Sequence, residues 1–364
     1  MHSMKSSRFV GLLACLALFM GLWSSSSAQA LLPAEKNLFV LDVSGSTDFR
    51  TLWNFSLRPS IVNKLKQPFG FPEGATKSGK PVSPVDITIF AISGNSYDEP
   101  ILPIVTSADA NELWAVVDDV GFNPSKARLK EISDAIFGGK GIFTMQSEYL
   151  RSSPLKVPNL TTCEKESAET LRTSTSGFLR DAEPNQRKQI AQVVCKLANR
   201  IALNLRTADE YFKKPHCPGK GKPCSDIFGA IVRASDVARD LAIGTPSGSV
   251  RPSMCIAIAS DMLHNDYRMK KDSILNSREI ARTATKTEAF SRGKLAAQAI
   301  DLKFPSKSKL NLRIVVLGQG TGTNPLSIEY RSILNSYWNG VWQQAGVAET
   351  GLTTSLDRAC QGSA

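Results

Sequence analysis

The sequence has only three histidines, His2, His216 and His264, and it contains no Gly-x-Ser-x-Gly turn. A serine hydrolase of the α/β-hydrolase type needs both a histidine base and a nucleophile exposed on such a turn. A metal-assisted hydrolase needs a general base whose pKa lies near neutrality, a role that histidine fills most often. We therefore expect a protein that is not an enzyme, with a metal-dependent hydrolase as the alternative.

Long apolar runs are absent after position 30, so no transmembrane segment is expected in the mature chain. The one long run, at positions 9–23, follows a basic start and precedes Ala28-Gln29-Ala30. This order is typical of a secretory signal peptide over residues 1–30, cleaved after Ala30. We expect an exported protein, periplasmic or extracellular. A membrane anchor and a lipoprotein cleavage site at Cys15 are the alternatives.

Acidic residues are fewer than basic ones, with 33 aspartates and glutamates against 44 lysines and arginines. A nucleic-acid-binding protein gathers its basic residues on one face together with aromatic residues, and the sequence has no such cluster. We expect no nucleic-acid partner. The basic surface suits acidic cell-surface polymers and acidic protein partners equally well.

Cysteine is present in an even number once Cys15 is removed with the leader, which indicates disulfides in an exported chain. Cys217 and Cys224 flank a turn-rich loop and are expected to pair. Cys163 with Cys195 is a second candidate pair. Cys255 lies in an apolar stretch and is interpreted as a buried thiol.

The stretch Asn37–Thr47, NLFVLDVSGST, carries the strongest chemical signal in the chain. Its apolar part is typical of a buried parallel strand, and it ends in Asp42, Ser44 and Ser46. A strand end that turns into a loop can direct all three side chains to one point. One carboxylate and two hydroxyls form a hard oxygen site that suits Mg²⁺ or Mn²⁺. A simple Asp/Ser turn is the alternative.

This pattern resembles the Asp-x-Ser-x-Ser signature of the von Willebrand factor A (VWA) family, in which it forms the first loop of a metal-ion-dependent adhesion site. The family draws its further ligands from two later loops. Ser225-Asp226, at the start of a predicted helix, resembles the second loop, with serine where threonine is usual. The alternative is that Ser225 is only a helix N-cap.

Asp261 resembles the aspartate of the third loop, because it directly follows the apolar stretch 254–260. Met262 stands where the family usually has glycine, and a plain turn aspartate is the alternative. His264 and Asp266 are interpreted as loop residues, although they lie close enough to line the rim of the site. The resemblance covers roughly residues 37–120 and 224–346.

The resemblance implies a role for each ligand. Ser44 and Ser46 would coordinate the metal through their hydroxyls, and Asp42 and Asp261 would hold it directly or through water. Ser225 would be a direct ligand when a partner is bound, and one position would stay open for a carboxylate from a protein partner. The implied function is an exported, metal-dependent, adhesion-type binding module. A structural exported protein with a degenerate metal site is the alternative.

Strand and helix patterns alternate along the chain, which predicts an α/β fold with a Rossmann-like, mostly parallel sheet flanked by helices. The resemblance implies one VWA-like domain over residues 37–346, interrupted by a mainly helical insertion at about 140–223 and followed by a C-terminal tail over 347–364. Strands are predicted at 38–41, 85–92, 101–105, 254–260 and 312–317, and helices at 52–66, 107–120, 125–137, 186–205, 225–241, 276–300 and 325–344.

Overall fold

The computed structural model describes most of the chain after position 34. The described residues are 35–44, 53–65, 85–117, 126–152, 154–174, 177–214, 216–217, 224–244, 251–266, 273–318, 326–347 and 350–352. The predicted signal peptide lies outside these ranges, as do Ser46 and most of the predicted tail. No helix in the described part of the chain is both long and apolar enough to span a membrane.

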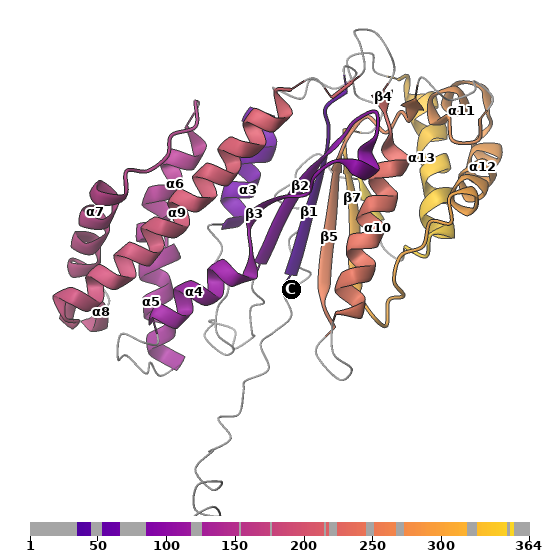
Figure 1. The fold of residues 1–364 in the computed structure, drawn as a ribbon. Helices are drawn as coiled ribbons and strands as arrows, with labels where there is room; N and C mark the ends of the chain where they lie inside the picture. Colours follow the sequence, from indigo (N-terminus) through magenta and orange to yellow (C-terminus); the bar gives the residue numbers. More distant parts are fainter. Residues whose placement is uncertain are drawn as a thin grey trace, which may run out of the picture. The chain divides into compact units, whose positions relative to one another are not determined.

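The fold is built on a six-stranded, mostly parallel sheet in the order β3-β2-β1-β5-β7-β8 (Figure 1). Its strands are β1 (Glu35–Asp42), β2 (Val85–Ile92), β3 (Leu102–Val105), β5 (Ser253–Ala259), β7 (Asn311–Leu317) and β8 (Thr350–Leu352). Every neighbouring pair is parallel except β2 and β3. The α/β prediction is therefore confirmed, and β3 is an edge strand, as its Pro103 indicated.

Strand order reverses between β1 and β5, which lie side by side although more than 200 residues separate them. Counted within this sheet alone, the order is 3-2-1-4-5-6, that of the doubly wound α/β fold. Residue Leu41 pairs with Ala259, so both strands end at the same level. Ligands of such sheets bind beyond the carboxyl ends of the strands at this reversal.

Alternate residues of β1 enter two separate cores, one on each side of the sheet. Phe39 and Leu41 pack with the helices before position 213, whereas Leu38 and Val40 pack with the helices that follow. The first group comprises α3 (Arg58–Leu65), α4 (Ser107–Val117), α5 (Lys126–Phe137), α6 (Ile142–Arg151), α7 (Leu160–Arg172), α8 (Gly177–Asp181) and α9 (Pro184–Phe212). The second comprises α10 (Ile227–Ile243), α11 (Ser277–Thr283), α12 (Lys286–Ala299) and α13 (Ile328–Gln344). Continuous apolar strands are what a sheet covered on both faces requires.

Two helix predictions were wrong in detail. No helix was predicted within 150–176, where the structure has α7. The single helix predicted over 276–300 is two helices, because Thr285 caps α12 and exchanges hydrogen bonds with Glu288 in a capping box. At the other end of the chain, β8 adds a parallel strand beside β7 from within the predicted tail.

Two disulfides have both of their cysteines in the described part of the chain, and both were predicted pairs. Cys163 joins α7 to Cys195 of α9 with a Cα–Cα distance of 5.9 Å, and Cys217 pairs with Cys224 across 5.7 Å. Cys255 is disulfide-bonded too, so its interpretation as a buried thiol was wrong. The sequence did not reveal this disulfide, because a free buried cysteine would also lie in an apolar strand such as β5.

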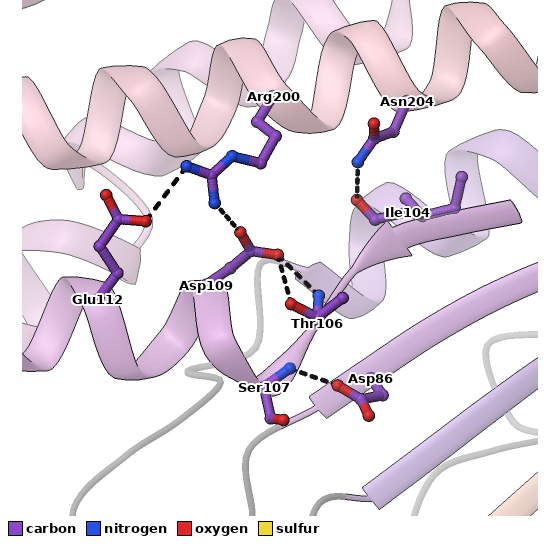
Figure 2. A network of polar contacts seen from close by, with 8 residues as sticks. All are labelled: Asp86, Ile104, Thr106, Ser107, Asp109, Glu112, Arg200 and Asn204. Carbon is purple, nitrogen blue, oxygen red and sulfur yellow. Dashed lines mark hydrogen bonds and ion pairs between the residues drawn. The ribbon is translucent and has the colours of Figure 1, made fainter.

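The polar network in Figure 2 connects helices α9 and α4 to the edge strand β3. Arg200 of α9 pairs with Asp109 of α4 and lies 3.2 Å from Glu112, and Asn204 Nδ2 donates to the carbonyl of Ile104 in β3 at 3.0 Å. The hydrogen bond to Asp109 raises the pKa of Arg200. Asp109 Oδ2 also accepts from the backbone and hydroxyl of Thr106. The network therefore covers the edge strand with α9.

Candidate metal centre

The loop after β1 is fixed by the carboxylate of Asp42, which is fully buried. Asp42 Oδ1 accepts from the backbone N–H of Ser44 at 2.9 Å, and Oδ2 accepts from the hydroxyl of Ser260 at 2.7 Å. Ser44 is itself only 4% exposed. The first hydrogen bond closes a tight turn at the strand end, and the second joins the ends of β1 and β5.

The loop after β5 holds the second predicted carboxylate, Asp261, which is 2% exposed. Its Oδ1 accepts from the backbone N–H of Leu263 at 3.0 Å, while the neighbouring hydroxyl of Ser260 accepts from the N–H of Met262 at 2.9 Å. Two short side chains thus close two overlapping turns directly after the strand.

Met262 has a φ of +61°, in the left-handed region that favours glycine. It stands at the position where the resemblance expects glycine, the residue that adopts this conformation most readily. The surroundings hold this strained conformation. The Met262 side chain is fully buried, and its carbonyl accepts from Ser277 Oγ at 2.9 Å and from Trp338 Nε1 at 3.0 Å.

Ser225 lies in the short strand β4 (Cys224–Ser225), which pairs with β6 (Asn265–Asp266), and it is 4% exposed. It is not the N-cap of α10, so that alternative was wrong. Asp226 is the cap, because its Oδ1 accepts from Gly229 N at 2.9 Å. Asp226 therefore caps the helix, and the adjacent Ser225 is the predicted metal ligand.

Backbone contacts bring the Ser225 loop to the end of the sheet. The N–H of Asp226 donates to the carbonyl of Ser93, just after β2, at 2.8 Å, and Asp226 Oδ2 accepts from Ser96 N at 3.2 Å. The N–H of Val43 in turn donates to the carbonyl of Ile92 at 3.3 Å. The ends of β1 and β2 and the start of α10 are thus joined directly.

His264 connects the remaining loops and is only 3% exposed. Its Nδ1 accepts from the N–H of Ile227 at 3.0 Å, and its own N–H donates to Ser277 Oγ at 2.8 Å. Its ring also meets Phe228 edge-on at 4.9 Å between centroids. His264 is therefore a buried connector between α10 and the loop after β5. Its side chain does not line a rim.

These hydrogen bonds, together with the peptide bonds between neighbouring residues, form a closed circuit, which we call the edge circuit. It runs from Asp42 through Ser260, Met262, Ser277, His264, Ile227 and Asp226 to Ser93, and the Val43–Ile92 bond completes it. The circuit joins the loops that carry Asp42, Ser44, Ser225 and Asp261 at the carboxyl end of the sheet, where the strand order reverses.

The donor chemistry of these four residues fits a hard cation. Two carboxylates and two hydroxyls supply oxygen donors alone, the kind that Mg²⁺ and Mn²⁺ prefer. Each carboxylate can accept about four hydrogen bonds or metal contacts. The described residues hold no cluster of three or more histidines, cysteines, aspartates or glutamates, which a zinc-type site would draw upon.

Sequence reasoning missed the residues that position this centre. Ser260 precedes Asp261 at the strand end, so the pairing of β1 with β5 could have indicated its contact with Asp42. His264 and Ser277 carried no such signal, because their contact joins the loop after β5 to the start of α11, 13 residues further along the chain. Comparison of the chain with family models, curated proteins and solved structures finds no match.

Proposed function

We propose that this chain is a VWA-type domain whose metal-ion-dependent adhesion site holds Mg²⁺ or Mn²⁺ and binds a carboxylate of a protein partner. One observation carries the proposal: loops that are far apart in sequence meet through the edge circuit at the reversal of strand order. The order of the three loops along the chain, the oxygen-only donor set and the glycine-like backbone of Met262 support it further.

The proposed metal ligands are Asp42, Ser44, Ser46, Ser225 and Asp261. Ser46 lies outside the described residues. Two aspartates only balance the charge of a divalent cation. The site therefore carries no net negative charge that would repel one more acidic ligand. Mg²⁺ usually retains water in its shell, and a partner carboxylate can replace one such water. The predicted export would bring the site to partners outside the cytoplasm.

The metal is tested by thermal unfolding of the purified protein with increasing Mg²⁺ or Mn²⁺. A ligand that binds only the folded state raises the midpoint with concentration. We expect the wild type to shift and Asp42→Asn, which keeps the side-chain shape, to lose most of the shift. Ser277→Ala keeps every proposed ligand but breaks a link of the edge circuit, so it should still respond, with a smaller shift than the wild type.

The absence of any shift in the wild type at millimolar metal would overturn the metal proposal and favour a structural protein with a degenerate site. An equal shift in Asp42→Asn would show that the metal binds elsewhere. His264 Nδ1 does not offer the hydrolase alternative a free base, because it already accepts a backbone hydrogen bond from Ile227.

The carboxylate partner is tested on surfaces that carry poly-glutamate or poly-glutamine. The chain is basic, so some retention on poly-glutamate will be independent of metal. The informative part is the retention that EDTA removes and Mg²⁺ restores. We expect that part in the wild type, and we expect neither Asp42→Asn nor the poly-glutamine surface to show it.

A further inference from the structure

Cys255 of β5 is disulfide-bonded, but its partner is not among the described cysteines. The other described cysteines are already paired with each other, as Cys163–Cys195 and Cys217–Cys224. A cysteine sulfur forms one disulfide bond only. Of the seven cysteines in the sequence this leaves Cys15 and Cys360, which both lie outside the described residues.

Cys15 lies within the predicted signal peptide, ahead of the expected cleavage after Ala30. It would therefore leave with the leader, and the mature chain would keep Cys360 as the one cysteine that can pair with Cys255. The even number of cysteines in the mature chain is then fully used in three disulfides.

The register of the sheet brings Cys255 within reach of the chain that follows β8. That strand ends at Leu352, which pairs with Val316, and Val316 pairs with Ile258 of β5. Cys255 thus lies two strands across and three residues back along β5, a distance of about 14 Å at ordinary strand spacings. Residues 353–360 can span about 26 Å when extended. The chain can therefore turn back over the sheet and reach Cys255.

The face of β5 that carries Cys255 has room for such a segment. Cys255, Ala257 and Ala259 share this face and are buried in the first core. The opposite face of β5 presents the larger Ile256 and Ile258. Because protein interiors are closely packed, the space above the two alanines must be filled by another part of the chain.

We propose that Cys255 and Cys360 form a disulfide that anchors the C-terminal tail, residues 353–364, over β7 and keeps β8 in the sheet. Strand β8 has three residues and lies at the edge, with β7 as its neighbour. So short a strand gains little from its own hydrogen bonds. A covalent anchor after it limits its departure from β7.

Formation of this bond removes one proton and one electron from each of the two thiols. The two electrons pass to an external disulfide, of the kind found in oxidising compartments. One cysteine thiolate attacks that disulfide and releases a thiol, and the second attacks the mixed disulfide and releases another. The products are the Cys255–Cys360 bond and two external thiols.

The pairing is tested by tryptic digestion of the purified, unreduced protein and mass spectrometry. Trypsin should release Cys255 in residues 240–268 and Cys360 in residues 359–364. We expect these two peptides to be joined and to separate on reduction. Joining of 240–268 to residues 9–36, which contain Cys15, or to a peptide with one of the other cysteines would overturn the proposal. Alkylation of Cys255 in the denatured, unreduced protein would overturn it too.

The anchoring role is tested with Cys360→Ser, which leaves Cys255 in the core. The lost bond closes a loop of about 100 residues, so the unfolding midpoint should fall by about 5–10 °C. The amides of residues 350–352 should lose protection from hydrogen exchange. Cys217→Ser combined with Cys224→Ser is the matched control, because that disulfide spans only 7 residues. The control should have a smaller midpoint loss and keep residues 350–352 protected. Wild-type protection of these amides in Cys360→Ser would overturn the anchoring role.

Discussion

The carboxyl edge of the sheet and the helices α6 to α9 both bury polar side chains, but they satisfy those side chains in opposite ways. At the edge, Asp42, Ser260, Ser277 and His264 bond to each other or to nearby backbone. In α6, the buried Gln146 Oε1 has no partner within the described residues. The edge therefore gains stability from its polar groups, whereas the helices bury a polar atom at a cost to stability.

The two regions also differ in how they are held. Hydrogen bonds between loops hold the edge, while a disulfide and the Arg200 network hold the helices. Substitutions in the helices should therefore leave the metal response of the edge intact, and the following predictions test that independence.

The largest effect is expected from Cys163→Ala combined with Cys195→Ala. The disulfide spans 32 residues, and the loop-entropy relation gives a loss of about 3–4 kcal/mol in the free energy of unfolding. Urea denaturation measures the loss. The midpoint shift with Mg²⁺ should remain, because no proposed metal ligand lies in α7 or α9. Loss of the metal shift would show that the two regions are not independent.

Asp42→Ala should cost about 2–3 kcal/mol without metal, because the hydroxyl of Ser260 and the N–H of Ser44 lose a buried acceptor. Urea denaturation in EDTA measures this loss apart from any metal effect. A cost under about 0.5 kcal/mol would mean that the carboxylate adds no net stability to the edge.

Ser277→Ala should cost about 1–2 kcal/mol, since it leaves the buried N–H of His264 without its acceptor. Hydrogen exchange is the sharper measurement, because the amides of Met262, Leu263 and His264 should lose protection while those of α7 do not. Unchanged protection in that loop would show that the hydrogen bonds of Ser277 do not stabilise it.

The smallest effect is expected from Arg200→Met, at about 1 kcal/mol. Asp109 is buried but keeps its hydrogen bonds from Thr106, and the Arg200 side chain is 46% exposed. Glu112→Gln is the matched control, with an expected loss of only a few tenths, because both groups of that pair are exposed. Urea denaturation of the two single variants and the double variant gives the coupling; equal losses in both single variants would contradict this account.

The strands could be predicted closely because a parallel sheet covered on both faces leaves an unbroken apolar run. Val85–Ile92 was predicted with its observed bounds, and β5 differs from the predicted strand by one residue at each end. The α7 helix escaped detection because its buried face is made of Cys163, Ser167 and Leu171. Only one of these is a large apolar residue, and the cysteine is buried as half of a disulfide.

At the edge, the motif residues were visible in the sequence and their supports were not. Ser225 and Asp261 could be proposed from their places beside a predicted helix and strand. The links through His264 and Ser277 depend on how the loop after β5 meets the start of α11, which no local periodicity encodes.

The hydrogen bond between Asp42 and Ser260 joins residues 218 positions apart in the chain. During synthesis β1 and β2 emerge early, but β1 gains its second neighbour only after most of the chain has been made. Contacts between such distant segments form slowly, because a long loop must close before they contribute. A ligand that needs both Asp42 and the loop after β5 would therefore bind only chains in which β1 and β5 have already paired. Its binding would mark the point in folding at which the two halves of the sheet have come together.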